Sequence, residues 1–473
     1  MNKKAKIFFK NLSYTVTANF ATLGISILLN LFVPKLLGVT EYSYWQLYVF
    51  YSSYVGFLHF GWIDGIYLKI GGENYDDLDK KSLGSQFWYL MLLELFISGI
   101  VILGVITFEP QAEQSSILVL TAIESIVVIG KTYVLYIFQS TNRIKDYAQL
   151  SRNDRYIYIL FLGVYFFTGG RNFYWLIVID ILSKLLMTLW GVIQIKDMVT
   201  TKVLPLKGLA SDILDNINIG SKLMLSNVAS MLILGTIRFF VQHKWSIETF
   251  GKLSFTLSIS NMFLTFINAV GVVMFPLLRR TNQNKLPSLF IILRSIFVPI
   301  TYILLLFFVP AISVLKIWLP AYQDSYIYMG ILFPIVIYEG RMSLLINTYL
   351  KSLRMEKIIL IVNVGTLFIS ALLSLFTIYI FGNLTLSVIL ILFCLALRCN
   401  TAEYFLCKKM KVNLRFDPIF ETILTIIFVL SNLVFNNSLV SFFIYSICLF
   451  SYLIMDHRST IGNTKAFITL LKE

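Results

Sequence analysis

The chain has 473 residues, of which 58% are hydrophobic and only 14% are charged. Its mean hydropathy is +0.79, and this composition excludes an ordinary soluble globular protein, in which about a quarter of the residues are charged. The formal net charge is +14. Because the basic residues gather in short loops between apolar runs, membrane topology explains the charge, and we expect no nucleic-acid partner.

Apolar runs of membrane-spanning length follow one another along the whole chain. A helix needs about 20 apolar residues to cross a bilayer, and we count about 14 such runs. The expected spans are residues 12–32, 44–66, 87–107, 116–138, 156–168, 174–195, 218–241, 254–276, 289–309, 326–347, 358–381, 384–405, 418–435 and 439–455. The sequence therefore predicts an all-α, polytopic membrane protein without a soluble domain on either face.

Basic residues occupy every second loop and both ends of the chain. The intervening loops hold only Lys35, Arg171, Lys244, Lys252 and Lys316. Basic loops are retained in the cytoplasm, so the alternation predicts that both termini are cytoplasmic. It also supports the number of spans, because one helix more or fewer would scramble the pattern.

The first twelve spans divide into two sets of six. We expect an N-lobe at 1–195, a cytoplasmic linker at 196–217, a C-lobe at 218–411, and a C-terminal helix pair with its tail at 412–473. When the halves are aligned without gaps, Asn19 matches Asn227 and Tyr67 matches Phe275. Both halves start in the cytoplasm, so the repeat is parallel. Such repeats are typical of transporters that hold substrate between the halves.

Several of the predicted spans carry a stripe of polar side chains on one face. Asn19 lies in the stripe of the first span, and Asn261 lies in that of the eighth. A polar face at membrane depth contacts protein or water rather than lipid. Small polar residues also occur where helices pack tightly, which is the alternative. Stripes on several spans, in both halves, favour a hydrated cavity, to which we assign both asparagines.

Basic residues inside the spans are candidates for binding an anion. The candidates are Lys131, Lys184, Arg341, Arg398 and Arg238. Arginine grips phosphate oxygens in a fork and lysine acts as a point charge. We expect the first four to face one cavity between the halves, whereas Arg238 can also snorkel to the membrane surface. For each residue, a structural ion pair is the alternative.

Three acidic residues are candidates for coupling transport to a proton or sodium gradient. These are Asp64, Glu124 and Asp180. Asp180 lies one helical turn before Lys184 and can pair with it. Glu339 and Arg341 are two residues apart, so they cannot point in the same direction.

The sequence contains none of the common catalytic motifs of soluble enzymes. It contains no Walker A, HExxH or GxSxG motif, its three histidines form no cluster, and its four cysteines form no CxxC pair. We therefore expect that the protein is not an enzyme and that it binds neither a metal nor a cofactor. A membrane polysaccharide polymerase is the alternative from another class, but it needs a sizeable outside loop with acid and base groups. The outside loops predicted here are short.

The residues from 34 to 72 read PKLLGVTEYSYWQLYVFYSSYVGFLHFGWIDGIYLKIGG. The pair Leu37-Gly38, the pair Tyr42-Ser43 and the segment Gly61-Trp62-Ile63-Asp64-Gly65 resemble the first outside turn and second helix of Wzx-type O-antigen and polysaccharide repeat-unit flippases. These belong to the multidrug/oligosaccharidyl-lipid/polysaccharide exporter superfamily. Ser43 stands where glycine is commoner. The resemblance extends over the full length.

This resemblance implies transport of an undecaprenyl-pyrophosphate-linked oligosaccharide (a repeat unit of O-antigen, capsule or exopolysaccharide) across the bacterial inner membrane by alternating access. It implies membrane lipid, a polysaccharide polymerase and a chain-length regulator as partners. Within the superfamily, a peptidoglycan lipid-precursor flippase and a multidrug cation antiporter are the alternatives. The embedded basic residues argue against an antiporter, and the pattern at 34–72 favours the polysaccharide branch.

Overall fold

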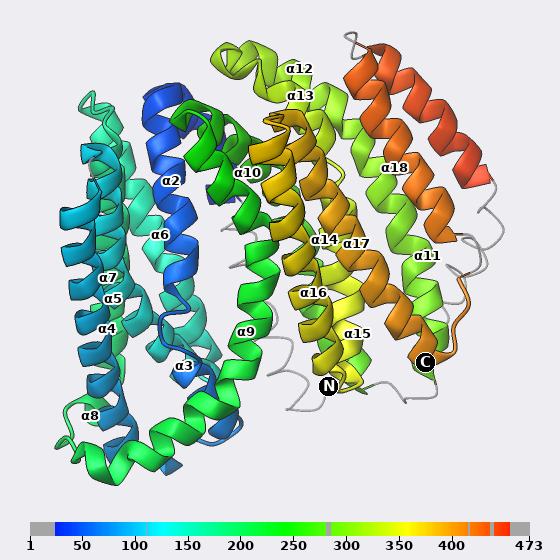
Figure 1. Ribbon diagram of the computed structural model, residues 1–473. Helices are drawn as coiled ribbons and strands as arrows, with labels where there is room; N and C mark the ends of the chain where they lie inside the picture. The colour runs from blue at the N-terminus through cyan, green and yellow to red at the C-terminus, as the bar shows by residue number, and fades with distance from the viewer. Residues whose placement is uncertain (1–23, 110, 281–284, 415–416, 436–438, 455–473) are drawn as a thin grey trace. The chain divides into compact units, whose positions relative to one another are not determined.

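The computed structural model describes residues 24–109, 111–280, 285–414, 417–435 and 439–454, with the side chains of 265, 266 and 268–280 left out. In these ranges every regular element is a helix. Contacts divide the chain into unit 1, Met1–Val228, and unit 2, Ala229–Glu473 (Figure 1). The predicted all-α polytopic fold is confirmed, while the predicted four-part domain organisation stays a prediction.

Unit 1 is a bundle around one central helix. Its elements are the helix Gly24–Leu37, α2 Val39–Val55, α3 Trp62–Lys69, the short turn η1 Tyr75–Asp77, α4 Lys80–Phe108, α5 Ala112–Ser140, α6 Ile144–Phe167, α7 Phe173–Gln194, α8 Lys196–Val199 and the first part of α9 Leu206–Lys244. Helix α5 contacts α2, α3, α4, α6 and α7. Helix α5 therefore lies in contact with these five other helices of unit 1.

Unit 2 contains the rest of α9 and the helices that follow it. These are α10 Ile247–Arg280, α11 Leu286–Leu304, η3 Leu305–Phe307, α12 Phe308–Trp318, η4 Pro320–Tyr322, α13 Ser325–Leu332, α14 Ile335–Arg341, η5 Met342–Ile346, α15 Asn347–Ser352, α16 Glu356–Leu375, η6 Phe376–Ile380, α17 Leu384–Met410, α18 Asp417–Val434 and the helix Leu439–Ile454. Figure 1 shows α16 and α17 side by side.

The two units pair their helices in the same order. In unit 1, α5 packs against α2, α4 and α7, and α6 packs against α7. In unit 2, the consecutive helices α13 and α14 pack against α10 and α17, α14 also against α11, and α16 against α17. Each partner occupies the corresponding position in its set of six spans. The pairing order agrees with the parallel repeat expected from the sequence.

Most predicted spans coincide with one long helix or with consecutive helices. Within the described ranges, nine such stretches are long and apolar enough to cross a membrane by length and composition. Helix α6 differs from its prediction, because it begins at Ile144 rather than at residue 156. The charged residues Asp154 and Arg155, read from the sequence as loop, are part of this helix. Their charges are met by other side chains of unit 1, as described below.

Prolines mark the interruptions in unit 2. Pro299 lies inside α11, Pro310 lies in α12 just after the turn η3, and Pro334 separates α13 from α14. Proline lacks the N–H that an α-helix needs and clashes with the preceding turn. The turn η3 and the break before α14 therefore each lie next to a proline.

Short polar residues begin several of the long helices. The side chains of Asp79, Asn172 and Asn383 accept hydrogen bonds from the first-turn amides of α4, α7 and α17 at 3.0, 2.8 and 3.1 Å. The Glu41 carboxylate accepts another from the Phe173 amide, at 2.8 Å. A carboxylate at a helix N-terminus stabilises the amides that have no partner within the helix. Glu41 therefore connects the start of α2 to the start of α7.

The two long connections predicted to be cytoplasmic pack against each other in unit 1. Lys80 Nζ lies 2.7 Å from an Asp197 carboxylate oxygen, and the Tyr75 hydroxyl donates to the other at 2.6 Å. Burial acts to raise the pKa of Asp197, but the bonds from Lys80 and Tyr75 outweigh it and hold this pKa below its ordinary value. The indole of Trp88 also donates to the Val199 carbonyl at 2.9 Å.

The second predicted span is broken between α2 and α3. Residues 56–61 form turns rather than helix, and Gly61 has a φ of 85°, which side chains other than glycine rarely adopt. The backbone of α3 lies directly against α9, where a Cβ on Gly65 would overlap the backbone of Asn216 and one on Gly220 would overlap that of Gly61. The glycines of the segment at 61–65 thus permit this close helix contact.

We expect Gly65→Ala to lower the free energy of unfolding by about 1–3 kcal/mol, since the added methyl group would overpack a backbone-to-backbone contact. Thermal unfolding of the purified protein in detergent measures this. Gly104→Ala in α4 is the matched control, because a Cβ there meets nothing within 4 Å and alanine favours a helix. Equal stability of the two variants would contradict the close contact of α3 with α9.

Candidate functional site

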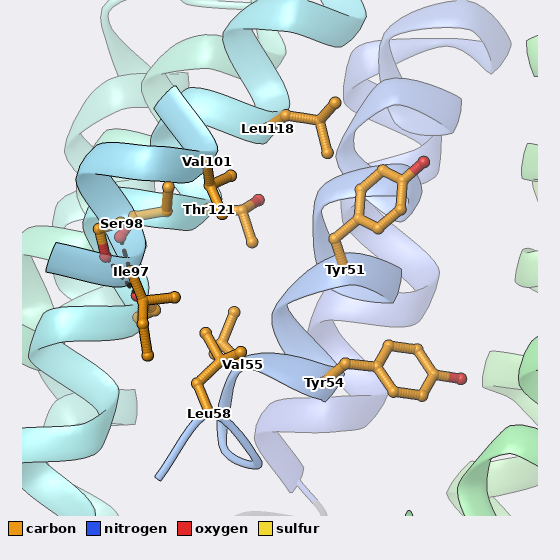
Figure 2. Close-up of a pocket in the computed structure, with 11 residues that line it drawn as sticks. Tyr51, Tyr54, Val55, Leu58, Ile97, Ser98, Val101, Leu118 and Thr121 are labelled. Atoms are coloured by element: carbon orange, nitrogen blue, oxygen red, sulfur yellow. Dashed lines mark hydrogen bonds between the residues drawn. The ribbon is translucent and has the colours of Figure 1, made fainter. Parts of the chain in front are cut away.

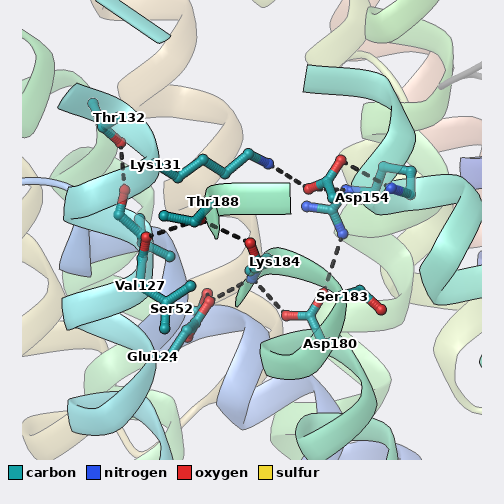
Figure 3. Close-up of polar contacts among 12 residues, drawn as sticks. Ser52, Glu124, Val127, Lys131, Thr132, Asp154, Asp180, Ser183, Lys184 and Thr188 are labelled. Atoms are coloured by element: carbon teal, nitrogen blue, oxygen red, sulfur yellow. Dashed lines mark hydrogen bonds and ion pairs between the residues drawn. The ribbon is translucent and has the colours of Figure 1, made fainter. Parts of the chain in front are cut away.

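A network of charged side chains, four of them buried, joins α5, α6 and α7 in unit 1. Its members are Glu124 and Lys131 from α5, Asp154 and Arg155 from α6, and Asp180 and Lys184 from α7 (Figure 3). Below, these six residues are called the unit 1 network. It holds four of the candidates for anion binding or ion coupling, two from the fourth predicted span and two from the sixth.

Lys184 occupies the centre of the unit 1 network. Its ammonium donates to the Glu124 carboxylate and, at 2.5 Å, to the Asp180 carboxylate. The pairing of Asp180 with Lys184 follows the i, i+4 prediction. Glu124 is fully buried and Lys184 is 8% exposed, so removal of Lys184 would leave the Glu124 carboxylate without a cation at membrane depth.

The remaining members extend the unit 1 network along α6. Lys131 Nζ lies 2.5 Å from Asp154 Oδ2, and Arg155 Nη1 lies 3.4 Å from Asp180 Oδ1. The network therefore contains three basic and three acidic groups. An anion that enters it must compete with carboxylates already in place.

Helix α2 supplies hydroxyl groups to the same carboxylates. The Tyr48 hydroxyl donates to Asp180 at 2.7 Å, and the Ser52 hydroxyl donates to Glu124 at 2.6 Å. These residues lie one turn apart on α2. Sequence analysis missed them, because a tyrosine and a serine in an aromatic-rich helix carry no distinguishing signal.

Unit 2 contains a second buried network that includes the C-terminal region. Arg294 of α11 bonds to Glu403 of α17 at 2.9 Å and lies 2.8 Å from Glu421 of α18. Arg341 of α14 bonds to Glu421 at 2.5 Å and to Asn400 at 2.6 Å. These contacts connect α18 to α11 and α14, which are themselves bonded to α17. Sequence analysis assigned no role to the terminal helix pair, whereas in the structure α18 also packs against α13 in unit 2.

Arg398 forms a separate pair in unit 2. Its guanidinium donates to Glu339 of α14 at 2.5 Å and to Ser230 of α9 at 2.7 Å. Glu339 and Arg341 thus point to different partners, as their spacing predicted. The Glu339–Arg398 pair joins the fourth and sixth spans of its half, as the Glu124–Lys184 pair does in unit 1.

The other candidate residues lie apart from these networks. Arg238 is half-buried on α9, donates to Ser254 at 2.9 Å and lies over the Phe250 ring. Asn261 is exposed on α10, and Asn19 lies outside the described residues. Asp64 is buried at 3.7 Å from His59, away from the two other candidate coupling acids.

The embedded basic candidates are therefore all engaged by polar or acidic groups. Lys131 and Lys184 belong to unit 1, and Arg341 and Arg398 belong to unit 2. That these four line one shared cavity stays a prediction. Sequence analysis missed most of the acids that meet them, since Asp154 was read as loop and Glu403 and Glu421 were not singled out. A search for every acid in or beside an apolar run would have found them.

A pocket of about 190 Å³ lies in unit 1 between α2, α4 and α5. Its lining is mainly apolar and aromatic, with hydroxyl groups from Ser98, Thr121 and Ser125 (Figure 2). Ser98 and Ser125 are hydrogen-bonded at 2.9 Å. Val55 and Leu58 line it beside the break between α2 and α3.

Comparison with solved structures finds transporters of the MOP superfamily. The lipid II flippase MurJ, in an inward closed conformation, matches at a TM-score of 0.65 and 12% identity over 96% of this chain and 100% of that chain. A multidrug resistance MATE family transporter in an inward-facing conformation matches at 0.59 and 12% over 83% of this chain and 98% of that chain.

A MOP superfamily transporter from Pyrococcus furiosus, described as having a binding pocket of reverse polarity, matches at a TM-score of 0.50 and 11% identity over 85% of this chain and 96% of that chain. No protein-family model and no curated protein matches the sequence. At these identities the likeness shows the fold, which is that of MOP-superfamily transporters.

We expect Lys184→Met to lower the free energy of unfolding by about 3–5 kcal/mol, because it leaves the Glu124 carboxylate buried without a cation. The double variant Lys184→Met/Glu124→Gln should recover much of this loss, since Asp180 keeps Arg155 and Tyr48. Thermal unfolding in detergent measures both.

The exposed pair Lys69–Asp212, at 3.5 Å, supplies the control. Lys69→Met should lower the free energy of unfolding by no more than about 1 kcal/mol. If the Lys184 and Glu124 substitutions were simply additive, the proposed coupling between these two side chains would be wrong.

Proposed function

We propose that the chain is a flippase that moves a polyprenyl-diphosphate-linked oligosaccharide from the cytoplasmic to the outer leaflet of a bacterial inner membrane. The observation that carries the proposal is the fold likeness to the lipid II flippase MurJ, which extends over 96% of this chain and all of that one. The turn and glycine segment within residues 34–72 support the polysaccharide branch, where the lipid carries a repeat unit of O-antigen, capsule or exopolysaccharide.

Alternating access gives this reaction a physical basis. The sugar and diphosphate are too polar to cross lipid unaided, whereas the polyprenyl tail can stay in the bilayer. Two bundles of matching fold can carry the polar headgroup past the membrane barrier by changing their relative orientation. Since the sequence contains no Walker A motif, we propose that an ion gradient or removal of the product supplies the drive.

The basic residues inside the spans are ion-paired, and this bears on the charge of the substrate that the protein could bind. Lys131, Lys184, Arg341 and Arg398 each meet a carboxylate, so their number alone no longer disfavours a multidrug cation antiporter. Arg155 is the member of the unit 1 network best placed to receive a diphosphate. Its side chain is 37% exposed, and its bond to Asp180 is long at 3.4 Å.

We propose that Arg155 contacts the anionic headgroup, with Glu124 and Asp180 as candidate coupling acids. An arginine at the edge of the network can turn toward phosphate oxygens while each of its acidic partners keeps another cation. Its partners Asp154 and Asp180 keep Lys131 and Lys184, respectively.

Deletion of the gene in its host should abolish surface polysaccharide while lipid-linked repeat units accumulate inside the cell. Complementation with Arg155→Gln should restore export to less than about a tenth of the wild-type rate, the effect of losing about 1.4 kcal/mol or more of headgroup binding. Arg152→Gln, on the same helix and outside the unit 1 network, should restore export fully.

Export of polysaccharide is measured on the cell surface, and lipid-linked repeat units are measured in membrane extracts. Intact surface polysaccharide with a changed resistance to cationic drugs would favour the antiporter instead. A defect in peptidoglycan synthesis would favour the lipid-precursor flippase, and loss of polymer length with normal export of single units would favour the polymerase.

A further inference from the structure

One buried carboxylate in unit 1 stands apart from the ion-pair networks. Glu94 lies in α4, within the most apolar of the candidate spans, whose mean hydropathy is 2.5. Its side chain is fully buried, and neither carboxylate oxygen has a hydrogen-bond partner among the described residues. The other buried carboxylates of the described ranges lie within ion-pair distance of a lysine, arginine or histidine.

The surroundings of Glu94 supply no compensating charge. Helix α4 packs mainly against α5 and α8. On α5, Glu124 is engaged by Ser52 and Lys184, Lys131 is engaged by Asp154, and the Tyr133 hydroxyl donates to the Leu83 carbonyl. On α8, Asp197 is held at the cytoplasmic end by Lys80 and Tyr75.

An ionised carboxylate in such surroundings is unstable. The transfer of an unpaired charge from water to an apolar medium costs so much that the group takes up a proton instead. In the bilayer, acidic residues that persist at such positions mark ion or proton pathways. The arrangement described here therefore favours the neutral acid at Glu94.

The pocket between α2, α4 and α5 offers a route for the proton. Ser98 lies one turn along α4 from Glu94, on the same face of the helix, and lines the pocket. Its hydroxyl is bonded to that of Ser125, the neighbour of Glu124. Tyr51 and Tyr54 line the pocket from α2 (Figure 2).

The pocket also adjoins the turn between α2 and α3. Val55 and Leu58 line it at the turn between α2 and α3. Non-helical backbone at membrane depth is tolerated where it is buried in protein or lines a hydrated cavity. Rearrangement at this turn would admit water to the pocket, one helical turn away from Glu94.

We propose that Glu94 is a proton-binding residue of the transport cycle, separate from the unit 1 network. The carboxyl group holds its proton while α2, α4 and α5 are packed as they are here. When the pocket hydrates, the O–H bond of the acid breaks and the proton passes to water, leaving the carboxylate. Reprotonation from the opposite side of the membrane completes the cycle. This proposal rests on the proposed transport function.

Infrared difference spectroscopy tests the protonation without any substrate. The purified protein should show the carbonyl band of a protonated carboxyl group that disappears as the pH is raised, and Glu94→Gln should lack this band. Glu124→Gln is the matched control and should retain it. If Glu94→Gln does not fold, Glu94→Asp should shift the band. An unchanged band in the Glu94 variants would overturn the proposal.

Lipid transfer in liposomes tests the coupling. A fluorescent polyprenyl diphosphate disaccharide is reconstituted with the protein, and transfer between leaflets is followed with and without a pH gradient. The wild type should respond to the gradient severalfold, and Glu94→Gln should lose this response. An equal response of both proteins would overturn the role of Glu94. Absence of any transfer by the wild type would overturn the proposed function but leave the infrared result standing.

Discussion

The cost of a charge at membrane depth governs how both halves of this protein are built. A lone ion there is expensive, and the chain meets this cost by pairing acids with bases within each unit. In unit 1, Lys184 holds Glu124 and Asp180, and in unit 2, Arg341 holds Glu421. Because the Glu124–Lys184 and Arg341–Glu421 pairs connect different helices, charge neutrality and helix packing become one constraint.

The same constraint bears on the transport cycle proposed above. Each contains a bridge from its fourth to its sixth span, Glu124–Lys184 in unit 1 and Glu339–Arg398 in unit 2. Breaking such a bridge would leave an unpaired buried charge, so each bundle is expected to stay intact during alternating access. Flexibility is then left to segments without such bridges, among them the turn between α2 and α3. The pocket lined by that turn lies one helical turn from Glu94, which is why we propose that a proton there responds to its shape.

The sequence predicted the elements whose formation depends on the length of an apolar run. It failed for charged residues whose place in the fold depends on partners far away in the sequence. Apolar runs located the helices, and the i, i+4 spacing paired Asp180 with Lys184. Asp154 and Arg155 were read as loop because charges interrupt the apolar pattern, although Lys131 and Asp180 compensate them within α6 and its neighbours. Glu421 was overlooked because its basic partners lie far away in sequence, on α11 and α14. The glycines of the 61–65 segment formed part of the sequence pattern, but the need for glycine there becomes clear only from the close contact of α3 with α9.

The most direct test of the central claim is leaflet transfer by the purified protein. Liposomes containing a polyprenyl diphosphate oligosaccharide with a fluorescent sugar are treated with a reductant that does not cross membranes. If the protein is a flippase of such lipids, fluorescence should fall well below the level set by the outer leaflet alone, and a fluorescent phospholipid in the same liposomes should not follow. Protection of the inner-leaflet oligosaccharide lipid, equal to that in protein-free liposomes, would contradict the account.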